Sequence, residues 1–196
     1  MSHGLVSDPR LYVALTHFDN ELAAAAQAGG CGCGGRLHRA DYPRKPRGGP
    51  TGVGPEYDKR LSFCCACDDC RKRTTPESVR FLGRRVYLAA VFVLVSVMRH
   101  GITLARWVRL VAHLGISRRT LGRWRDWWLK RFPATTVWAR VRGRLVPPPD
   151  AFTLPSSWWS RLDPLTETER LRLILAWMLP LTTTSPGFGA RSFVVV

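Results

Sequence analysis

Apolar residues recur at helical spacing in two neighbouring stretches in the middle of the chain. The first stretch, over residues 103–114, carries an apolar stripe made of Leu104, Trp107, Val108, Val111 and Leu114. The second, over residues 118–132, carries a stripe made of Leu121, Trp124, Trp128 and Phe132. Because positions three and four residues apart share one face of a helix, both stretches are predicted to form amphipathic helices.

The residues between these two helices predict a tight turn. Gly115 suits the left-handed conformation in which helices commonly end, and Ser117 is a good N-cap for the helix that follows. The apolar run over residues 86–98 predicts a buried helix in front of them, because a membrane span needs about 20 apolar residues. Residues 81–132 are therefore expected to form a three-helix helix-turn-helix unit.

Helices are also predicted near both ends of the chain. Pro9, preceded by residues that can cap a helix, predicts an N-terminal helix within residues 1–30. Thr166 and Glu169 form a capping-box pattern, which predicts a C-terminal helix within residues 163–181. The fold class is accordingly expected to be mainly α.

The apolar face of the C-terminal helix has two interpretations. We expect it to dock on the core, with self-association as the alternative, and it consists of Leu171, Ile174, Leu175 and Met178. Residues 133–162, which include three consecutive prolines, are expected to form a proline-rich linker, and residues 182–196 a flexible tail.

The six cysteines fall into two clusters. Two pairs of thiolates on tight turns can supply the tetrahedral set of ligands that Zn²⁺ prefers. The predicted ligands are Cys31, Cys33, Cys65 and Cys70, with Cys67 or Cys64 as alternates in the second pair. The alternative is a small hydrophobic cluster of cysteines without a metal. Residues 31–80 are therefore expected to form a small β zinc-ribbon-like module with a long basic loop.

Positive charge is concentrated in the middle of the chain. The formal net charge is +16, and residues 99–144 contain twelve basic residues and one acidic residue. All but four of the basic residues are arginines, which coding bias could explain, but such bias does not explain the scarcity of acids. This distribution is typical of a surface that binds a polyanion.

The predicted DNA contacts lie on the polar faces of the two amphipathic helices. Arg118, Arg119 and Arg123 are expected to reach base edges. Phosphates are expected to be held by Arg106, Arg109 and Arg125, and Lys130 is a further predicted DNA-binding residue.

Three segments of the sequence, in this order, carry a resemblance to a known family. The first cysteine cluster in CGCGGRLHRADY, the second in FCCACDDCRKRTTPESVRFLGRRVYL, and the motif GISRRTLGRW together resemble the N-terminal recognition region of bacterial insertion-sequence transposases. The resemblance covers roughly residues 31–132. It implies that a zinc ribbon held by the predicted cysteine pairs precedes a DNA-binding unit whose recognition helix spans residues 117–131. Val111 departs from the small residue that the family has there.

A catalytic domain of that family is not expected here. Metal-dependent strand transfer needs three carboxylates on a strand-rich scaffold, whereas the acids after residue 132 are Asp150, Asp163, Glu167 and Glu169. We therefore expect a DNA-binding protein with structural Zn²⁺ and no enzymatic activity. The alternatives are a fragment or subunit of an active transposase, or an RNA-binding protein whose tryptophans stack on bases.

The start of the chain lacks a basic region followed by an apolar core, so we expect a cytoplasmic protein that does not bind a membrane. The expected partner is duplex DNA, with a second copy of this chain (a homodimer) or a transposase subunit as further partners.

Overall fold

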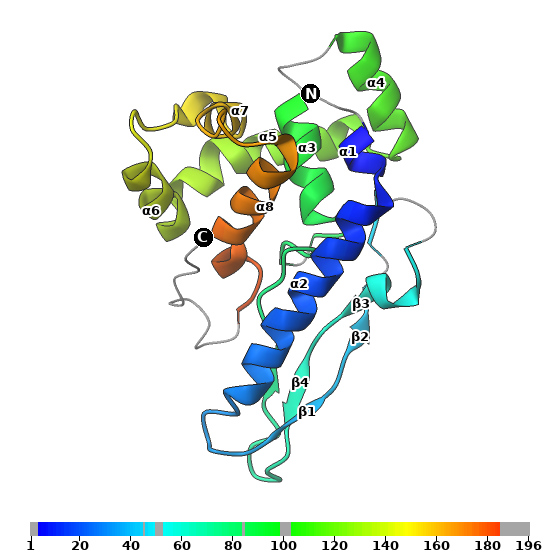
Figure 1. Ribbon diagram of the computed structural model, residues 1–196, viewed down its shortest axis with the longest axis vertical. Coiled ribbons are helices and arrows are strands. Elements are labelled where there is room, and N and C mark those ends of the chain that lie inside the picture. The colour runs from blue at the N-terminus through cyan, green and yellow to red at the C-terminus, as the bar shows by residue number, and fades with distance from the viewer. Residues whose placement is uncertain (1–3, 45, 50–52, 84, 99–102, 185–196) are drawn as a thin grey trace.

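The structure is a computed structural model that describes residues 4–44, 46–49, 53–83, 85–98 and 103–184, apart from the side chains of Arg106 and Leu110. The chain is mainly helical and has a small antiparallel sheet, as the sequence predicts. A body of helices lies at one end of the molecule and the strands lie toward the other, with the long helix α2 running between them (Figure 1).

Helix α2 connects the two parts of the molecule. After the short α1 (Gly4–Ser7), α2 (Pro9–Ala28) begins as predicted, because the Asp8 side chain accepts a hydrogen bond from the backbone N–H of Arg10. The first half of α2 places Tyr12 and Leu15 in the main core. The second half packs Ala23 and Ala26 against the strands, in a separate small core with Leu37, Leu61, Phe63 and Cys65.

The strands of the described residues form two antiparallel sheets. Strands β1 (Leu37–Arg39), β4 (Phe63–Cys65) and β5 (Arg73–Thr74) form a sheet in the order β1-β4-β5, and β2 (Tyr42–Pro43) pairs with β3 (Lys59–Arg60) after the 3-10 turn η1 (Pro55–Asp58). Leu37 lies opposite Cys65 in the register of β1 and β4. Since β1 follows the first cysteine cluster and β4 ends in the second, this register brings the two clusters to the same end of the sheet.

A buried carboxylate on α2 organises the segment that leads to the helical body. Asp19 Oδ1 accepts a hydrogen bond from the backbone N–H of Val79 at 2.7 Å, and Asp19 Oδ2 accepts one from Arg80 Nε at 2.8 Å. Both side chains of this ion pair are 1% exposed. The acid lies on the same face of α2 as Tyr12 and Leu15, where the sequence otherwise has apolar or small residues.

The two terminal nitrogens of the Arg80 guanidinium bind backbone carbonyls at the start of β3 and in the turn before it. Arg80 Nη1 donates to the carbonyls of Tyr57 at 2.9 Å and Glu56 at 3.2 Å, and Nη2 donates to that of Lys59 at 3.1 Å. Because a buried charge is costly unless it is paired and hydrogen-bonded, this set of acceptors accounts for the burial of Arg80.

Helix α3 (Ala89–Met98) is the centre of the helical body. Every residue in it except Ser96 is buried, which confirms the predicted buried helix. It contacts α1, α5 (Arg118–Asp126), α7 (Ser156–Ser160) and α8 (Glu167–Trp177). Within the described parts of the chain, no helix combines the length and apolarity needed to cross a bilayer.

Helix α4 (Leu104–His113) differs from its expected packing. Val111 is buried at 7% exposure, but Leu104 and Val108 are 76% and 49% exposed. Trp107 and Leu114 are half-buried against the core, so the predicted apolar stripe is fully buried only at Val111.

The turn between α4 and α5 forms as the sequence predicts. Gly115 has a φ of +62°, in the left-handed region, and Ile116 is buried. Ser117 caps α5, because its Oγ accepts a hydrogen bond from the backbone N–H of Thr120 at 3.2 Å. The second amphipathic stripe is also confirmed, with Trp124, Trp128 and Phe132 buried.

The prediction of a linker over residues 133–162 is wrong. A π-helical turn η2 (Trp127–Arg131) and a 3-10 turn η3 (Phe132–Ala134) lead into α6 (Thr136–Arg144), and η4 (Ala151–Thr153) leads into α7. The core takes in Trp138, Trp158 and Trp159 from this stretch. The burial of these large aromatic side chains outweighs the effect of the prolines on the local chain.

The C-terminal helix forms and docks as expected. Thr166 and Glu169 make the predicted capping box at the start of α8. Its predicted apolar face is at most 2% exposed and consists of Leu171, Ile174, Leu175 and Met178. The 3-10 turn η5 (Leu179–Leu181) follows, and the predicted tail lies outside the described residues from position 185 onward.

We predict that Asp19→Ala lowers the free energy of unfolding by roughly 3–5 kcal/mol, because it leaves the buried Arg80 without its counter-charge. Chemical denaturation followed by circular dichroism measures this change. Glu21→Ala is the matched control on the same helix. Glu21 is exposed and its one ion pair among the described residues is with the exposed His17, so its loss should change stability by less than about 0.5 kcal/mol. Equal effects of the two substitutions would contradict the prediction.

Candidate metal centre and basic helix face

Four cysteine sulfur atoms come together where the two predicted clusters meet. The Sγ atoms of Cys31, Cys33, Cys65 and Cys70 all lie within 4.8 Å of one another. The Sγ–Sγ distance is 3.7 Å for Cys31 and Cys70, and 3.4 Å for Cys33 and Cys65. These distances exceed the roughly 2.05 Å of a disulfide. They are close to the ~3.8 Å between sulfurs that surround a tetrahedral ion at about 2.3 Å. The cluster is therefore a candidate metal centre.

Two tight turns position these sulfurs. In the first, the backbone N–H of Cys31 donates to the carbonyl of Gly35 at 3.0 Å, and that of Gly34 donates to the carbonyl of Cys31 at 2.8 Å. In the second, the backbone N–H of Cys70 donates to the carbonyl of Cys67 at 3.1 Å. The first turn carries Cys31 and Cys33. The second turn carries Cys70 and comes shortly after Cys65 at the end of β4, so the two turns bring all four cysteines together.

Backbone amides donate to sulfurs in both turns, but of Cys33 and Cys65 only Cys33 has its pKa lowered overall. The backbone N–H of Cys67 donates to Cys65 Sγ at 3.4 Å, which lowers the pKa of Cys65, but burial and the neighbouring thiols raise that pKa overall. A backbone hydrogen bond from Gly35, with further bonds from the neighbouring thiols, lowers the pKa of Cys33 to about 6. Because the thiolate is the form that binds a metal, this turn is preorganised for coordination.

The two alternate cysteines lie outside the group of four. Cys64 Sγ donates to the backbone carbonyl of Arg71 at 3.3 Å, in the segment that leads to β5. Cys67 is exposed, although its Sγ approaches the backbone of Gly35. The structure therefore brings together Cys65 and Cys70 with Cys31 and Cys33.

Gly35 is the most crowded position of the centre. A Cβ at this residue would lie 2.6 Å from Cys67 Sγ and 2.7 Å from Cys65 Sγ, both closer than van der Waals contact allows. At Gly32, in the same turn, a Cβ would meet nothing within 4 Å. The sequence indicates that glycines are needed in this turn but does not distinguish these two, because the crowding arises from the second cysteine cluster.

Helix α5 presents an arginine-rich face to solvent. Arg118, Arg119 and Arg125 are exposed, whereas Thr120 and Trp124 on the opposite side are buried. Among the residues that the structure describes, no carboxylate lies within ion-pair distance of these three arginines. Their positive charge is therefore available to an external anion.

Three other predicted contacts are placed as follows. Arg109 is exposed on α4, and its Nε donates to the carbonyl of Ala105 one turn earlier. Lys130 forms an exposed ion pair with Asp126, with Nζ and Oδ1 2.9 Å apart. The side chain of Arg106 lies outside the described part of the structure.

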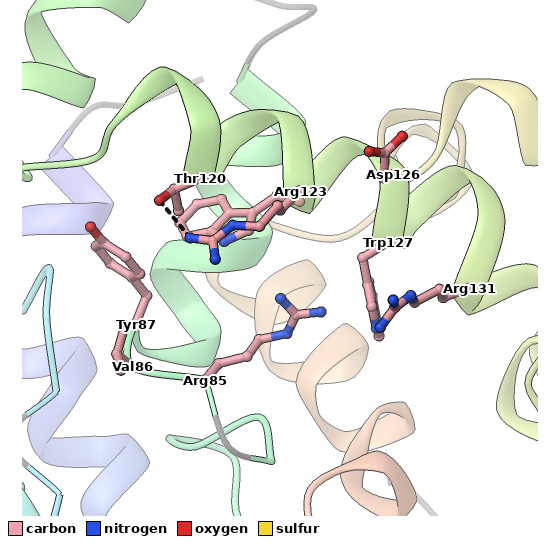
Figure 2. A pocket seen from close by; sticks show the side chains of 9 residues that line it. Arg85, Val86, Tyr87, Thr120, Arg123, Asp126, Trp127 and Arg131 are labelled. Atoms are coloured by element: carbon pink, nitrogen blue, oxygen red, sulfur yellow. Dashed lines mark hydrogen bonds between the residues drawn. The ribbon is translucent and has the colours of Figure 1, made fainter.

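Arg123 lines a pocket that the sequence does not predict. Its Nη2 donates to Thr120 Oγ1 at 3.1 Å, and the side chain lines a pocket with Arg85 and Arg131 (Figure 2). Arg85 lies just before α3 and Arg131 ends η2, so no local motif joins them. In the sequence, Arg85 and Arg131 each follow another basic residue, and this alone does not indicate that they share a pocket.

The tryptophans proposed to stack on RNA bases are mostly in the core. Trp124 is 4% exposed and Trp128 is 1% exposed. Trp107 and Trp127 are half-buried and pack against the same core. Ring stacking on a nucleobase is thus sterically unavailable to Trp124 and Trp128.

Comparison of this chain with family models, with curated proteins and with solved structures finds no match. Its function is therefore inferred from the cysteine centre and the basic helix face.

We predict that Gly35→Ala weakens metal binding roughly 10–100-fold, because the added methyl group displaces the sulfurs of the second cluster. Titration with Co²⁺, whose thiolate complexes absorb in the near ultraviolet, measures the affinity. Gly32→Ala should bind Co²⁺ as the unaltered protein does. A Gly35→Ala protein with unchanged affinity would show that close packing at Gly35 does not constrain the metal centre, and no Co²⁺ binding by the unaltered protein would show that the sulfurs do not share an ion.

Proposed function

We propose that this protein binds duplex DNA with α5 as its recognition helix, and that a structural zinc centre supports the strands. The observation that carries the proposal is the row of exposed arginines on α5, none of which has a carboxylate within ion-pair distance among the described residues. Such a row follows a tight glycine turn, as in helix-turn-helix proteins, whose second helix enters the major groove.

The position of the arginines along α5 suits this role. Arg118 and Arg119 lie in the first turn of the helix, the part that contacts base edges in helix-turn-helix complexes. The arginine fork can bind guanine O6 and N7 together, which gives sequence discrimination. Arg125 and Arg109 are exposed on α5 and α4 and are assigned to phosphates.

Gly122 supports a close approach of α5 to the groove. It lies in the middle of α5, where glycine costs about 1 kcal/mol relative to alanine. A Cβ there would meet nothing within 4 Å, so the internal packing of the protein does not require glycine. A closely approaching DNA backbone or base edge supplies a reason for it.

Four thiolates favour zinc in a structural role. Soft sulfur ligands select zinc or iron, and a closed set of four leaves no open position for a substrate. The small core beside the centre consists of only a few side chains, so a metal would supply stability that burial does not. The order of cysteine ribbon and basic helical unit, which resembles the recognition region of insertion-sequence transposases, supports the same assignment.

We expect the purified protein to contain a single zinc ion per chain, and Cys65→Ser to lose it because a hydroxyl is a poor zinc ligand. Elemental analysis after dialysis measures the content. Cys64→Ser is the control, since the Cys64 thiol bonds to a carbonyl instead of joining the group of four. Full zinc content in Cys65→Ser would contradict the ligand assignment.

For DNA, we expect Arg119→Ala to lose roughly 1–3 kcal/mol of discrimination between a selected sequence and random duplex. Arg109→Ala should weaken binding to both duplexes equally, because a phosphate contact carries no sequence information. Fluorescence anisotropy on DNA obtained by in vitro selection measures both effects.

The exposed Arg161, at the end of α7, supplies the control for charge alone. Arg161→Ala should leave binding to the selected sequence nearly unchanged. Equal losses in all three variants on both duplexes would refute base reading by α5, and no binding at low salt would refute the DNA-binding function.

A further inference from the structure

A pocket of about 400 Å³ lies between the start of α5, the turn η2 and the segment before α3. Three arginines from these separate segments line it, namely Arg85, Arg123 and Arg131, together with the rings of Tyr87 and Trp127. Figure 2 shows the guanidinium groups of Arg85 and Arg131 extending toward each other, and that of Arg123 turned beneath α5 toward Thr120. The volume is within the range of small-molecule sites.

Arg85 is held in place by aromatic rings and not by an acid. Its Cζ lies 4.5 Å from the ring centroid of Phe92 and 4.8 Å from that of Trp127. Among the described residues, its guanidinium donates no hydrogen bond to a protein acceptor. Burial, with the nearby charges of Arg131 and Arg123, lowers the pKa of Arg85 to about 10. The group is therefore fixed, still charged at neutral pH, and without a counter-ion.

The one acid among the lining residues offsets this positive charge only in part, through its long-range attraction to Arg131. Asp126 is the acid that lines the pocket, and it is paired with Lys130 at 2.9 Å on the exposed side of the helix. Arg123 contacts the hydroxyl of Thr120, which is uncharged. Three guanidinium groups thus share one pocket, and among the described residues no carboxylate lies within ion-pair distance of them. Their mutual repulsion favours the entry of an anion.

We propose that this pocket binds a phosphate group. Arginine forks match the oxygens of phosphate bidentately, and three of them can saturate a tetrahedral dianion. The ring of Trp127 leaves an apolar wall for the group to which the phosphate is attached. One source of the phosphate is a phosphodiester of DNA that lies along α5, and this alternative rests on the proposed function. The other source is a free phosphate or phosphomonoester, and this alternative is independent of the proposed function.

The pocket is also linked to the turn in front of α5. Tyr87, which lines it, donates a hydrogen bond through its hydroxyl to the carbonyl of Gly115 at 2.9 Å. Its ring contacts that of Trp124 edge-on, with centroids 5.2 Å apart. A bound phosphate would therefore join the segment before α3 to both α5 and the turn that orients it.

Inorganic phosphate is the first probe. Calorimetric titration of the zinc-loaded full chain, with ionic strength held constant by chloride, should detect binding. Arg131→Gln and Arg123→Gln should each weaken it at least tenfold, whereas Arg161→Gln, outside the pocket, should not. Arg85→Gln removes packing against two rings, so the two exposed arginines carry the test, with thermal unfolding as a check on folding.

A second arm identifies the source of the phosphate. If a DNA phosphodiester occupies the pocket, Arg131→Gln should reduce the slope of log affinity against log salt by about 0.9. An unchanged slope together with lost phosphate binding supports the free phosphate or phosphomonoester.

Phosphate binding that is absent, or that is equal in the pocket variants and the control, overturns the proposal. This outcome is distinct from failure of the proposed function. If no variant of α5 alters DNA recognition but the pocket arginines still bind phosphate, DNA recognition fails and the pocket stands.

Discussion

The buried ion pair between Asp19 and Arg80 is the interaction on which the arrangement of the two parts of the molecule depends. Asp19 is fixed in the middle of α2, whose first half lies in the helical core and whose second half lies on the strands. Through Arg80 it holds both the chain that enters β3 and the segment that leads toward α3. Burial of this pair is tolerated because each charged atom has a partner.

The strand module depends on support from outside its own sheet. Its strands are two or three residues long, and its core consists of a few small or medium side chains that include two alanines of α2. So few buried groups supply little hydrophobic stabilisation against the entropy of ordering the loops. The helix α2 on one side and a metal among the four thiolates on the other would both reduce that deficit. The module and the helical body are thus coupled through α2 as well as through Arg80.

Features that depend on a few neighbouring residues were predictable from the sequence. The start of α2 at Pro9, the capping box at Thr166 and the turn at Gly115 each follow from local chemistry. The spacing of the cysteines predicts two ligand pairs but leaves Cys64 and Cys67 open as alternates, and the structure selects Cys65 and Cys70. Features that depend on distant partners were not predictable. The stretch over residues 133–162 was misread because its prolines are a local signal, whereas the burial of Trp158 depends on rings from η3 and α8.

The same distinction explains why the arginines of α5 divide into two groups. Trp124 packs edge-on against Tyr87 and Phe92, with ring centroids 5.2 Å and 5.1 Å apart, and this packing fixes the rotation of α5 about its own axis. With that rotation fixed, Arg119 faces solvent and Arg123 lines the pocket beside Arg85. Helical periodicity alone assigns both arginines to one polar face. The aromatic core separates them, so on the proposed function one is directed to bases and the other to a phosphate.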